Sequence, residues 1–388
     1  MAESGRTWQL AVEKWLKDKN NPELIPGFPQ FFLIRNTNNL PKLIIAKIVD
    51  DFLITGQKDD IIQFHESISK RFKVGRFLVD ENIMFNRLHI SQDRQYNITV
   101  SMDEYQKQIN PLSIAVTRRK QQNEKCTENE ITEFLGLTGK LNWLGHGILP
   151  QASYISSKLQ QYTGNLRVKH LMEANQLLRT IMKLRPTIKY TSPENNQEAL
   201  LNSSVLSFSD ASQGKTTYGQ TGYISGIYFQ NNNYHVLDWH SSKQYRVSFS
   251  SMGAEIIAAA ESADRSSLLS YAVNTSIKPI KPIPLILTIA SHGLYSTITT
   301  LHEGRDYRLR PTVSRIRDAF ESKEISTIQW IAGQKNIADA LTKCNPNIYI
   351  VLNNILQTKR IPATLFSNLE LNSNNSSDST TDNNIDNN

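Results

Sequence analysis

Five carboxylates stand where a divalent cation and a phosphate could meet. Asp50 and Asp51 are adjacent between two short apolar runs, although an isolated Asp-Asp pair is also common in ordinary turns. Asp210, Glu255 and Asp339 fall at the ends of three different expected elements. Carboxylate oxygens are ligands of Mg²⁺ in proteins, and acidic groups converging from several elements are typical of two-metal phosphodiester hydrolysis. Each acid could alone be a helix cap or a surface group, so the prediction depends on their joint order.

A tight turn must present the first pair. Residues 43–56 (LIIAKIVDDFLITG) are two apolar runs flanking the two acids, which predicts a β-hairpin with the carboxylates at its tip. Residues 58–74 follow with apolar positions near helical spacing, and more strands are expected around 76–101. Residues 128–185 repeat apolar positions every three or four residues, which predicts a helical region.

A sheet and its helices must position the other three acids. Beyond a polar stretch the apolar period changes to two, which predicts an antiparallel meander with Asp210 ending its first strand. Glu255 then lies in the first turn of a helix, and Asp339 at a later helix start. The expected elements are the strands VLSFSDAS, TGYISGIYF and YHVLDWH, a helix over 251–271, a buried strand over 284–290, helices near 293–301 and 311–322, and a strand over 325–331.

Positive charge is concentrated in one part of the chain. The formal net charge is +7, and in residues 140–189 Glu173 is the only acid. The bases there are Lys140, Lys158, Arg167, Lys169, Arg179, Lys183, Arg185 and Lys189. With Trp143, Tyr154 and Tyr162 interleaved, this block favours binding to a phosphate backbone. The alternative is a solvated basic face.

Several broad classes are excluded. The two cysteines lie far apart without partners, which excludes a disulfide scaffold and a zinc cluster. No apolar run reaches the length of a membrane span, and the N-terminus has no signal-peptide pattern, so we expect an intracellular protein, cytoplasmic or nuclear, that is not secreted. Nucleophile-elbow, P-loop, Rossmann and aspartic-protease motifs are also lacking.

Seven motifs, one of them in two segments, resemble the Pol polyprotein of copia-type LTR retrotransposons, over roughly residues 7–345. IVDDFLITG resembles the hairpin of its reverse transcriptase, LTGKLNWLG with PQASYISSKL its thumb, and HLMEANQLLRTIMKL the last thumb helix. SFSDAS, GAEIIAAAES, HGLYSTITT and WIAGQKNIADALTK resemble its RNase H segments in the correct order.

The resemblance implies RNA-directed DNA synthesis and cleavage of RNA in RNA–DNA hybrids, both with Mg²⁺ and without a small-molecule cofactor. It assigns Asp50 and Asp51 to the polymerase metal site, and Asp210, Glu255 and Asp339 to the RNase H metal site. The implied partners are an RNA–DNA hybrid or other nucleic acid, with other retroelement Pol or capsid products as further candidates, and no membrane.

The sequence departs from the family pattern in three ways. Only 49 residues precede Asp50, so the fingers and an earlier palm aspartate have no counterpart in them. Ile48 replaces the aromatic residue of the hairpin, and Ala290 stands where the family's RNase H has another aspartate. The neighbours weighed as replacements, none of them convincing, are Asp238, Glu261, Asp264, Ser291 and His292. We therefore expect a catalytically crippled enzyme fragment; the alternative is a non-catalytic nucleic-acid-binding protein derived from a retroelement.

The expected fold class is α/β. An α+β palm remnant and a helical thumb come first, followed by an RNase H-like mixed five-stranded sheet with flanking helices. The expected divisions are a truncated palm (1–105), the thumb or connection (106–190), a linker (191–203), an RNase H-like domain (204–345), a C-terminal extension (346–371) and a disordered tail (372–388).

Overall fold

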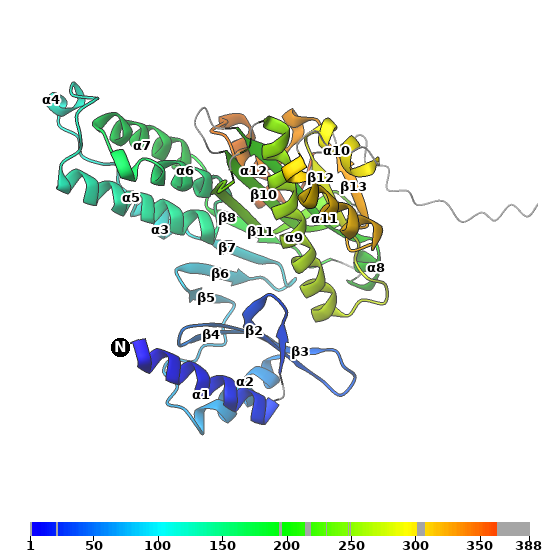
Figure 1. The fold of residues 1–388 in the computed structure, drawn as a ribbon. Helices are drawn as coiled ribbons and strands as arrows, with labels where there is room; N and C mark the ends of the chain where they lie inside the picture. Colours follow the sequence, from blue (N-terminus) through cyan, green and yellow to red (C-terminus); the bar gives the residue numbers. More distant parts are fainter. Residues whose placement is uncertain are drawn as a thin grey trace, which may run out of the picture.

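The computed structural model describes residues 2–20, 22–193, 196–213, 219–229, 231–246, 248, 250–300 and 307–362. Within these residues the strands form three separate sheets with helices packed on them, so the expected α/β class is confirmed (Figure 1). The tail expected from residue 372 lies outside the described residues. Among the described helices, none is long and apolar enough to cross a membrane.

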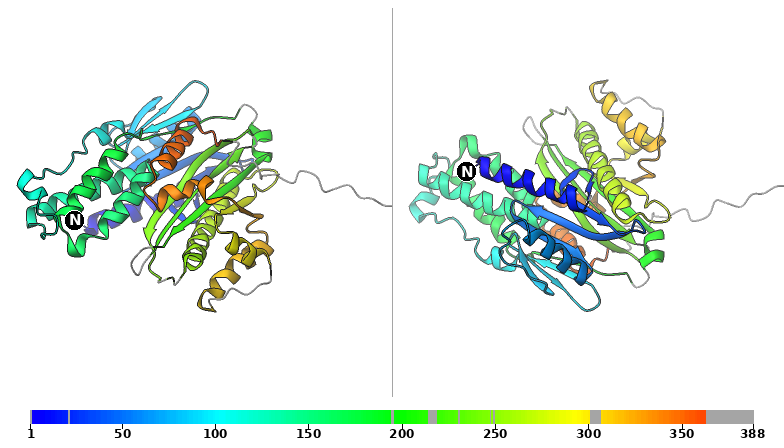
Figure 2. Two further views of the ribbon diagram at one scale, coloured as in Figure 1. Left: turned by 90° about the horizontal axis from the view of Figure 1, so that it is seen from above. Right: turned by 90° about the horizontal axis from the view of Figure 1, so that it is seen from below.

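The N-terminal sheet carries the predicted hairpin. Its order is β1-β2-β3-β4, and all neighbours are antiparallel. The strands are β1 (Glu23–Ile25), β2 (Phe28–Arg35), β3 (Pro41–Ile48) and β4 (Asp51–Gly56). The helices α1 (Ala2–Asn20) and α2 (Lys58–Ser69) share a buried cluster with β2 and β3, which includes Leu16, Phe32, Ile45 and Phe64. Figure 2 shows both helices on the side of this sheet that is away from the rest of the chain.

The second sheet joins segments that are far apart in sequence. β5 (Asn82–Phe85), β6 (Leu88–Gln92) and β7 (Ile98–Ser101) form a meander, and β8 (Thr187–Tyr190) pairs with β7 after the helical region. The strands expected around 76–101 therefore share a sheet with the end of the helical region.

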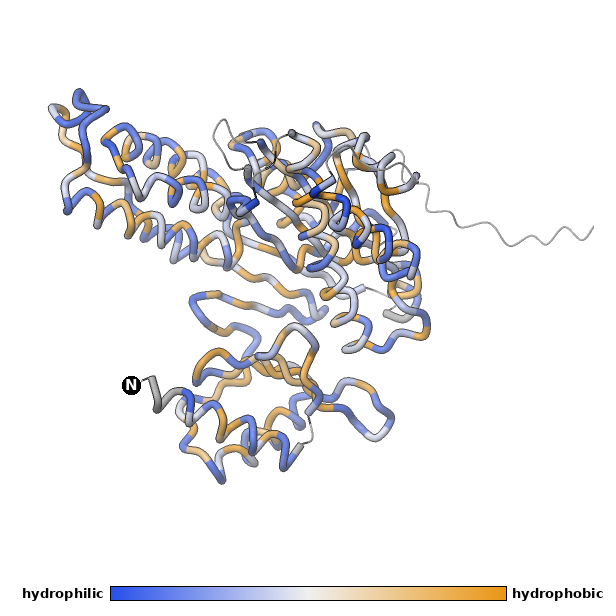
Figure 3. The backbone as a smooth tube through the Cα atoms, in the orientation of Figure 1, coloured by the Kyte–Doolittle hydropathy of each residue, from blue (hydrophilic) through white to orange (hydrophobic). Residues whose placement is uncertain are grey.

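The helical region lies between β7 and β8 and forms the arm at the left of Figure 1. Its main helices are α5 (Glu128–Gly147), α6 (Pro150–Gln160) and α7 (Val168–Ile181), with two short helices before them, α3 (Asp103–Lys107) and α4 (Val116–Arg119). A capping box of Thr127 and Glu130 starts α5, because each side chain binds the backbone N–H of the other residue. Apolar and polar residues alternate along these helices (Figure 3), and the apolar ones form the arm's core.

The third sheet has the order β11-β10-β9-β12-β13. β9 (Ser203–Ser212), β10 (Gln220–Phe229) and β11 (Asn233–Lys243) form the predicted antiparallel meander. β12 (Leu285–Ile289) runs parallel to β9, and β13 (Thr327–Trp330) parallel to β12. The predicted mixed five-stranded sheet is thereby confirmed.

Helices cover both faces of the third sheet. On one face α9 (Ser251–Ile277), α10 (His292–Thr299) and α11 (Arg310–Glu321) bury residues such as Val205 and Leu287. On the other face, Leu206 and Phe208 pack in the core that also contains α6 and α12 (Pro346–Thr358). The segment expected as an extension thus contributes a buried helix, and the expected linker contains a short helix, α8 (Asn196–Leu201).

Candidate active site

The first predicted site, Asp50 with Asp51, lies at the tip of the β3–β4 hairpin. Ile48 pairs with Asp51, and Val49 makes the turn with a φ of +54°. Both carboxylates are exposed. Over the described ranges no three His, Cys, Asp or Glu side chains stand close enough to hold one metal ion, and this includes the hairpin tip. The hairpin prediction is confirmed, but the structure brings no further ligand to the two acids.

The acids of the second predicted site lie at one end of the third sheet. Asp210 lies near the end of β9, opposite Gly222 of β10. The parallel register pairs Ser209 with Ile289, the last residue of β12, so Ala290 follows directly at the end of the sheet where Asp210 lies. Residues paired across strands point to the same side of a sheet. Continued by one residue beyond the end of β12, the same register places position 290 opposite Asp210.

Asp339 comes to the same place on a short 3₁₀ turn, η4 (Ile337–Leu341), which lies flat on β9 and β10. A Cβ added at Gly222 would lie 2.6 Å from the Cβ of Leu341, so this close approach requires glycine. Asn336 Nδ2 donates to the Ser209 carbonyl at 2.7 Å, and Ser212 Oγ donates to the Thr342 carbonyl at 3.0 Å. The loop that carries Asp339 is thus fixed by hydrogen bonds to β9.

Burial dominates the electrostatics of this site. Asp210 has only 4% of its side chain exposed, and burial raises its pKa to about 6, partly offset by the Lys343 ammonium. Glu255 lies in the second turn of α9, not in the first turn that the sequence predicted. Its pKa is raised to about 8 by burial and by the charge of Asp210. Asp339 also raises both pKa values. The three acids are therefore within electrostatic reach of one another, even though they do not surround one common point.

The sequence did not identify Lys343 and Thr342 as members of this site. Lys343 Nζ lies 3.4 Å from Asp210 Oδ2 and forms an ion pair with Asp339 Oδ1. Thr342 Oγ1 donates to Asp210 Oδ2. A signal was present, since Lys343 follows Asp339 by four residues, a spacing at which opposite charges meet on one helical turn.

The other acids weighed near Ala290 are engaged elsewhere. Asp238 accepts from the Tyr223 hydroxyl at 3.3 Å, Glu261 lies 3.7 Å from His240 Nε2, and Asp264 lies 3.4 Å from an Arg315 nitrogen. Ser291 caps α10 by accepting from the Leu294 N–H. The His292 ring packs edge-on against Trp330, whose Nε1 donates to the Ala290 carbonyl at 3.0 Å. None of these five residues therefore supplies a carboxylate at position 290.

The predicted basic block divides into two groups. Lys158 is half-buried in an ion pair with Glu173 at 2.6 Å, and Arg167 donates to the Asn123 carbonyl, so both serve structural contacts. The exposed members are Lys140, Lys169, Arg179, Lys183, Arg185 and Lys189, on α5, α7 and β8 and in the turn between α7 and β8.

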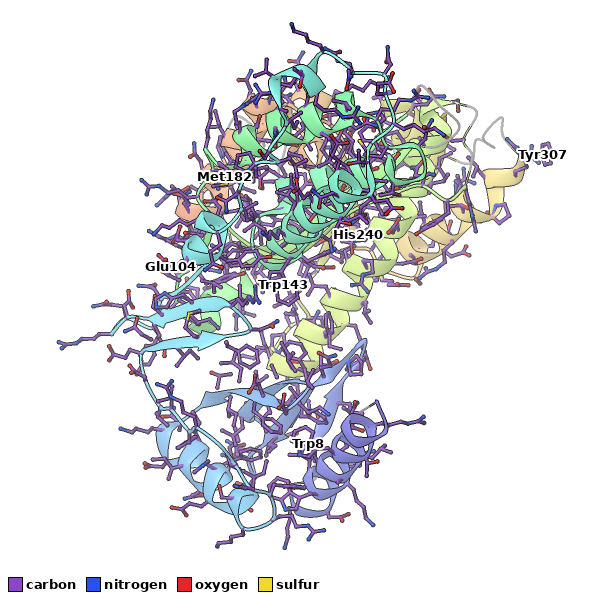
Figure 4. The ribbon with its side chains drawn as sticks, turned by 90° about the vertical axis from the view of Figure 1, so that its left-hand side faces the viewer. Trp8, Glu104, Trp143, Met182, His240 and Tyr307 are labelled. Atoms are coloured by element: carbon purple, nitrogen blue, oxygen red, sulfur yellow. The ribbon has the colours of Figure 1, made fainter. Side chains whose placement is uncertain are left out.

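The interleaved aromatic residues also divide. Tyr162 stacks on His170 and Tyr154 is half-buried, whereas Trp143 is 41% exposed. Trp143 is labelled beside His240 in Figure 4, on the face between the helical arm and α9. Of the three aromatic residues, Trp143 offers the most accessible ring.

The described part of the chain is similar to several solved structures. RNase H1 from the halophilic archaeon Halobacterium salinarum NRC-1 is 14% identical over 36% of this chain and 93% of its own, with a TM-score of 0.27. The N-terminal RNase H domain of a Mycobacterium tuberculosis protein, solved as a fusion with maltose-binding protein, is 16% identical over 36% of this chain and 90% of its own, with a TM-score of 0.27.

A foamy viral protease-reverse transcriptase in complex with an RNA/DNA hybrid is 14% identical over 83% of this chain, with a TM-score of 0.41. The match spans 37% of that viral chain's length. No protein-family model and no curated protein matches the sequence.

Proposed function

We propose that the chain is part of a copia-type retroelement reverse transcriptase that binds RNA–DNA hybrids and carries an RNase H-type site weakened by Ala290. The observation that supports this most is the gathering of Asp210, Glu255 and Asp339 at one end of β9, with position 290 beside Asp210. The sequence resemblance expects an acid at each of these four positions. Three are present, and the fourth is a methyl group.

The donor set suits a hard divalent cation. Asp210 and Asp339 are the pair that would hold Mg²⁺, because their carboxylate oxygens both lie against the Lys343 ammonium and such oxygens are the preferred protein ligands of this ion. Glu255 lies within electrostatic reach of both. A bound Mg²⁺ would supply activation of water and stabilisation of the leaving oxygen. The chain's own residues orient the site: Thr342 fixes the Asp210 carboxylate, and the bonds of Asn336 and Ser212 to β9 and the η4 loop fix Asp339.

The proposal does not extend to DNA synthesis by this chain. A polymerase site needs carboxylates that clamp two ions, and Asp50 and Asp51 stand exposed at a hairpin tip where the described residues bring no third ligand. The exposed bases of α5, α7 and β8 are the groups we propose for holding the phosphate backbone.

Restoring the fourth carboxylate tests the proposal. We expect Ala290→Asp to cleave the RNA strand of a labelled RNA–DNA hybrid at least about 100-fold faster than the parent with Mg²⁺, since misplaced reacting groups cost on this order. Ala290→Asn is the matched control, because it adds similar bulk without a full charge. Adding Asp210→Asn to Ala290→Asp should abolish the gain.

The outcomes separate the alternatives. Equal cleavage by the parent and by Ala290→Asp would mean that position 290 is not a ligand position. Hybrid binding without cleavage by either protein would favour the second candidate function, a non-catalytic nucleic-acid-binding protein of retroelement origin. That candidate is favoured by Ala290 itself and by the ion pairs of Lys343 with two of the three acids. Failure of both proteins to bind the hybrid would contradict both functions.

A further inference from the structure

The carboxylate site already contains a cation that belongs to the chain. The Lys343 ammonium lies 3.4 Å from Asp210 Oδ2 and is paired with Asp339 Oδ1. Asp210 has 4% and Asp339 13% of its side chain exposed, whereas Lys343 has 49% exposed. The ammonium therefore reaches from the solvent side into the space between two acids that are themselves largely buried.

Contacts that do not involve the ammonium fix the Asp210 carboxylate and the backbone around Lys343. Thr342 donates to Asp210 on one side of Lys343, and the Lys343 N–H donates to the Asp339 carbonyl at 3.0 Å. The Ser212 hydroxyl holds the Thr342 carbonyl. A lysine carries its charge on a flexible four-carbon stem, so its ammonium can leave toward water while the backbone stays in place.

We propose that Lys343 is a removable counter-cation that holds Asp210 and Asp339 together and that a divalent ion must displace on entering the site. The proposal rests on the proposed function in one respect: it takes Asp210 and Asp339 as ligands of the divalent cation. A positive charge between two carboxylates lowers the affinity for a second cation there by direct repulsion and by competition for the same oxygens. Metal binding and withdrawal of Lys343 are then one coupled event.

Titration with Mn²⁺ in the absence of nucleic acid tests the proposal independently of cleavage. Calorimetry should show that Lys343→Gln binds Mn²⁺ about tenfold or more tightly than the parent, which corresponds to about 1.4 kcal/mol. Lys343→Arg keeps the charge and should resemble the parent. Lys281→Gln is the matched control for net charge. Lys281 is exposed and lies shortly before β12 begins, at the end of the strand away from Asp210. Adding Asp210→Asn to Lys343→Gln should remove the gain.

Several results would overturn the proposal: unchanged or weaker Mn²⁺ affinity in folded Lys343→Gln, an equal gain in Lys281→Gln, or a gain that survives Asp210→Asn. Should Lys343→Gln not fold, the parent provides the test. The acetylation rate of Lys343, measured by peptide mass spectrometry relative to Lys281, should rise severalfold with millimolar Mg²⁺ as the ammonium is released. A rate that Mg²⁺ leaves unchanged would also contradict the proposal. These measurements involve neither binding nor cleavage of a hybrid. The proposal about Lys343 can therefore fail while the proposed function holds, and the reverse is also true.

Discussion

Burial and a neighbouring charge act in the same direction on the Glu255 carboxyl. Both raise its pKa, to about 8, while an unfolded chain would leave it near 4.5. Between these two pH values the folded protein retains a proton that the unfolded protein has released. The contribution of this carboxyl to folding stability therefore falls as pH rises from about 4.5 to about 8, and it levels off above that range.

Replacing Glu255 by Gln removes this pH-dependent cost. In metal-free buffer we expect Glu255→Gln to match the parent near pH 5 and to exceed it at pH 9 by a few kcal/mol at most, with solvent access reducing the effect. Thermal unfolding across this pH range is the measurement. The exposed Glu321 of α11, changed to Gln, is the control. Parallel pH profiles for the parent and Glu255→Gln would show that the carboxyl is not protonated in the folded protein.

Residue types and their order predicted Asp210, Glu255 and Asp339 as acids of the candidate site, but they did not predict Lys343 beside two of them. Asp210, Glu255 and Asp339 were identifiable because each follows or begins a periodic apolar segment. Lys343 belongs to the site because Asn336, Ser212 and Gly222 let η4 lie directly against β9 and β10. The placement of η4 on these strands depends on several long-range hydrogen bonds, and no local sequence pattern specifies it.

Local periodicity predicted the elements, and long-range pairing did not follow from it. The β3–β4 hairpin and the β9–β11 meander are formed by neighbouring segments, so alternating apolar residues were sufficient to predict them. The pairing of β7 with β8 joins segments separated by the whole helical arm. No turn links these strands, and their register depends on packing such as the Gln106 amide donating to the Leu184 carbonyl.

The basic block contains exposed bases and bases in structural contacts, so the binding of phosphates by the exposed ones can be tested. We expect hybrid affinity to fall with salt, and replacement of Lys169, Arg179, Lys183 and Lys189 by Gln to flatten the slope of log affinity against log salt by about one for each phosphate that is no longer bound. Lys158→Gln is the internal control. Because Lys158 is paired with Glu173, its replacement should leave the slope unchanged and lower stability by no more than about 1 kcal/mol. An unaltered slope in the quadruple variant would mean that these bases form only a solvated face.

At the scale of the whole molecule, the N-terminal unit, which consists of α1, α2 and the sheet β1–β4, packs on the C-terminal end of α9 (Figure 1). Ile25 and Leu33 pack on Ala272. Gly27, with a φ of +76°, approaches Leu268 so closely that an added Cβ would lie 2.4 Å from its side chain. The apolar contact is small, so polar groups around it must contribute to holding the two parts together.

Arg35 is the main polar contact across this interface. Its guanidinium donates to the Thr275 carbonyl at 2.6 Å and to the Ser276 carbonyl at 3.4 Å, in the last turn of α9. Its Nε also pairs with Glu23 at 2.9 Å, and only 7% of its side chain is exposed. The last carbonyls of a helix lack intrahelical partners and attract positive charge, so Arg35 satisfies the C-terminus of α9 from another part of the chain.

Arg35→Met should therefore release the N-terminal unit while retaining most of the apolar stem. Losing a charged hydrogen bond to these partly buried carbonyls costs about 1.5–3 kcal/mol, which is a large fraction of the stability of a small interface. The segment 70–81, which joins this unit to β5 and lies in no helix or strand, contains Arg71, Lys73 and Arg76 as tryptic sites. We expect trypsin to cut there about tenfold faster in Arg35→Met than in the parent. Arg94→Met, at an exposed turn, should leave the rate unchanged, and equal cutting of the parent and Arg35→Met would show that the apolar contacts alone hold the two units together.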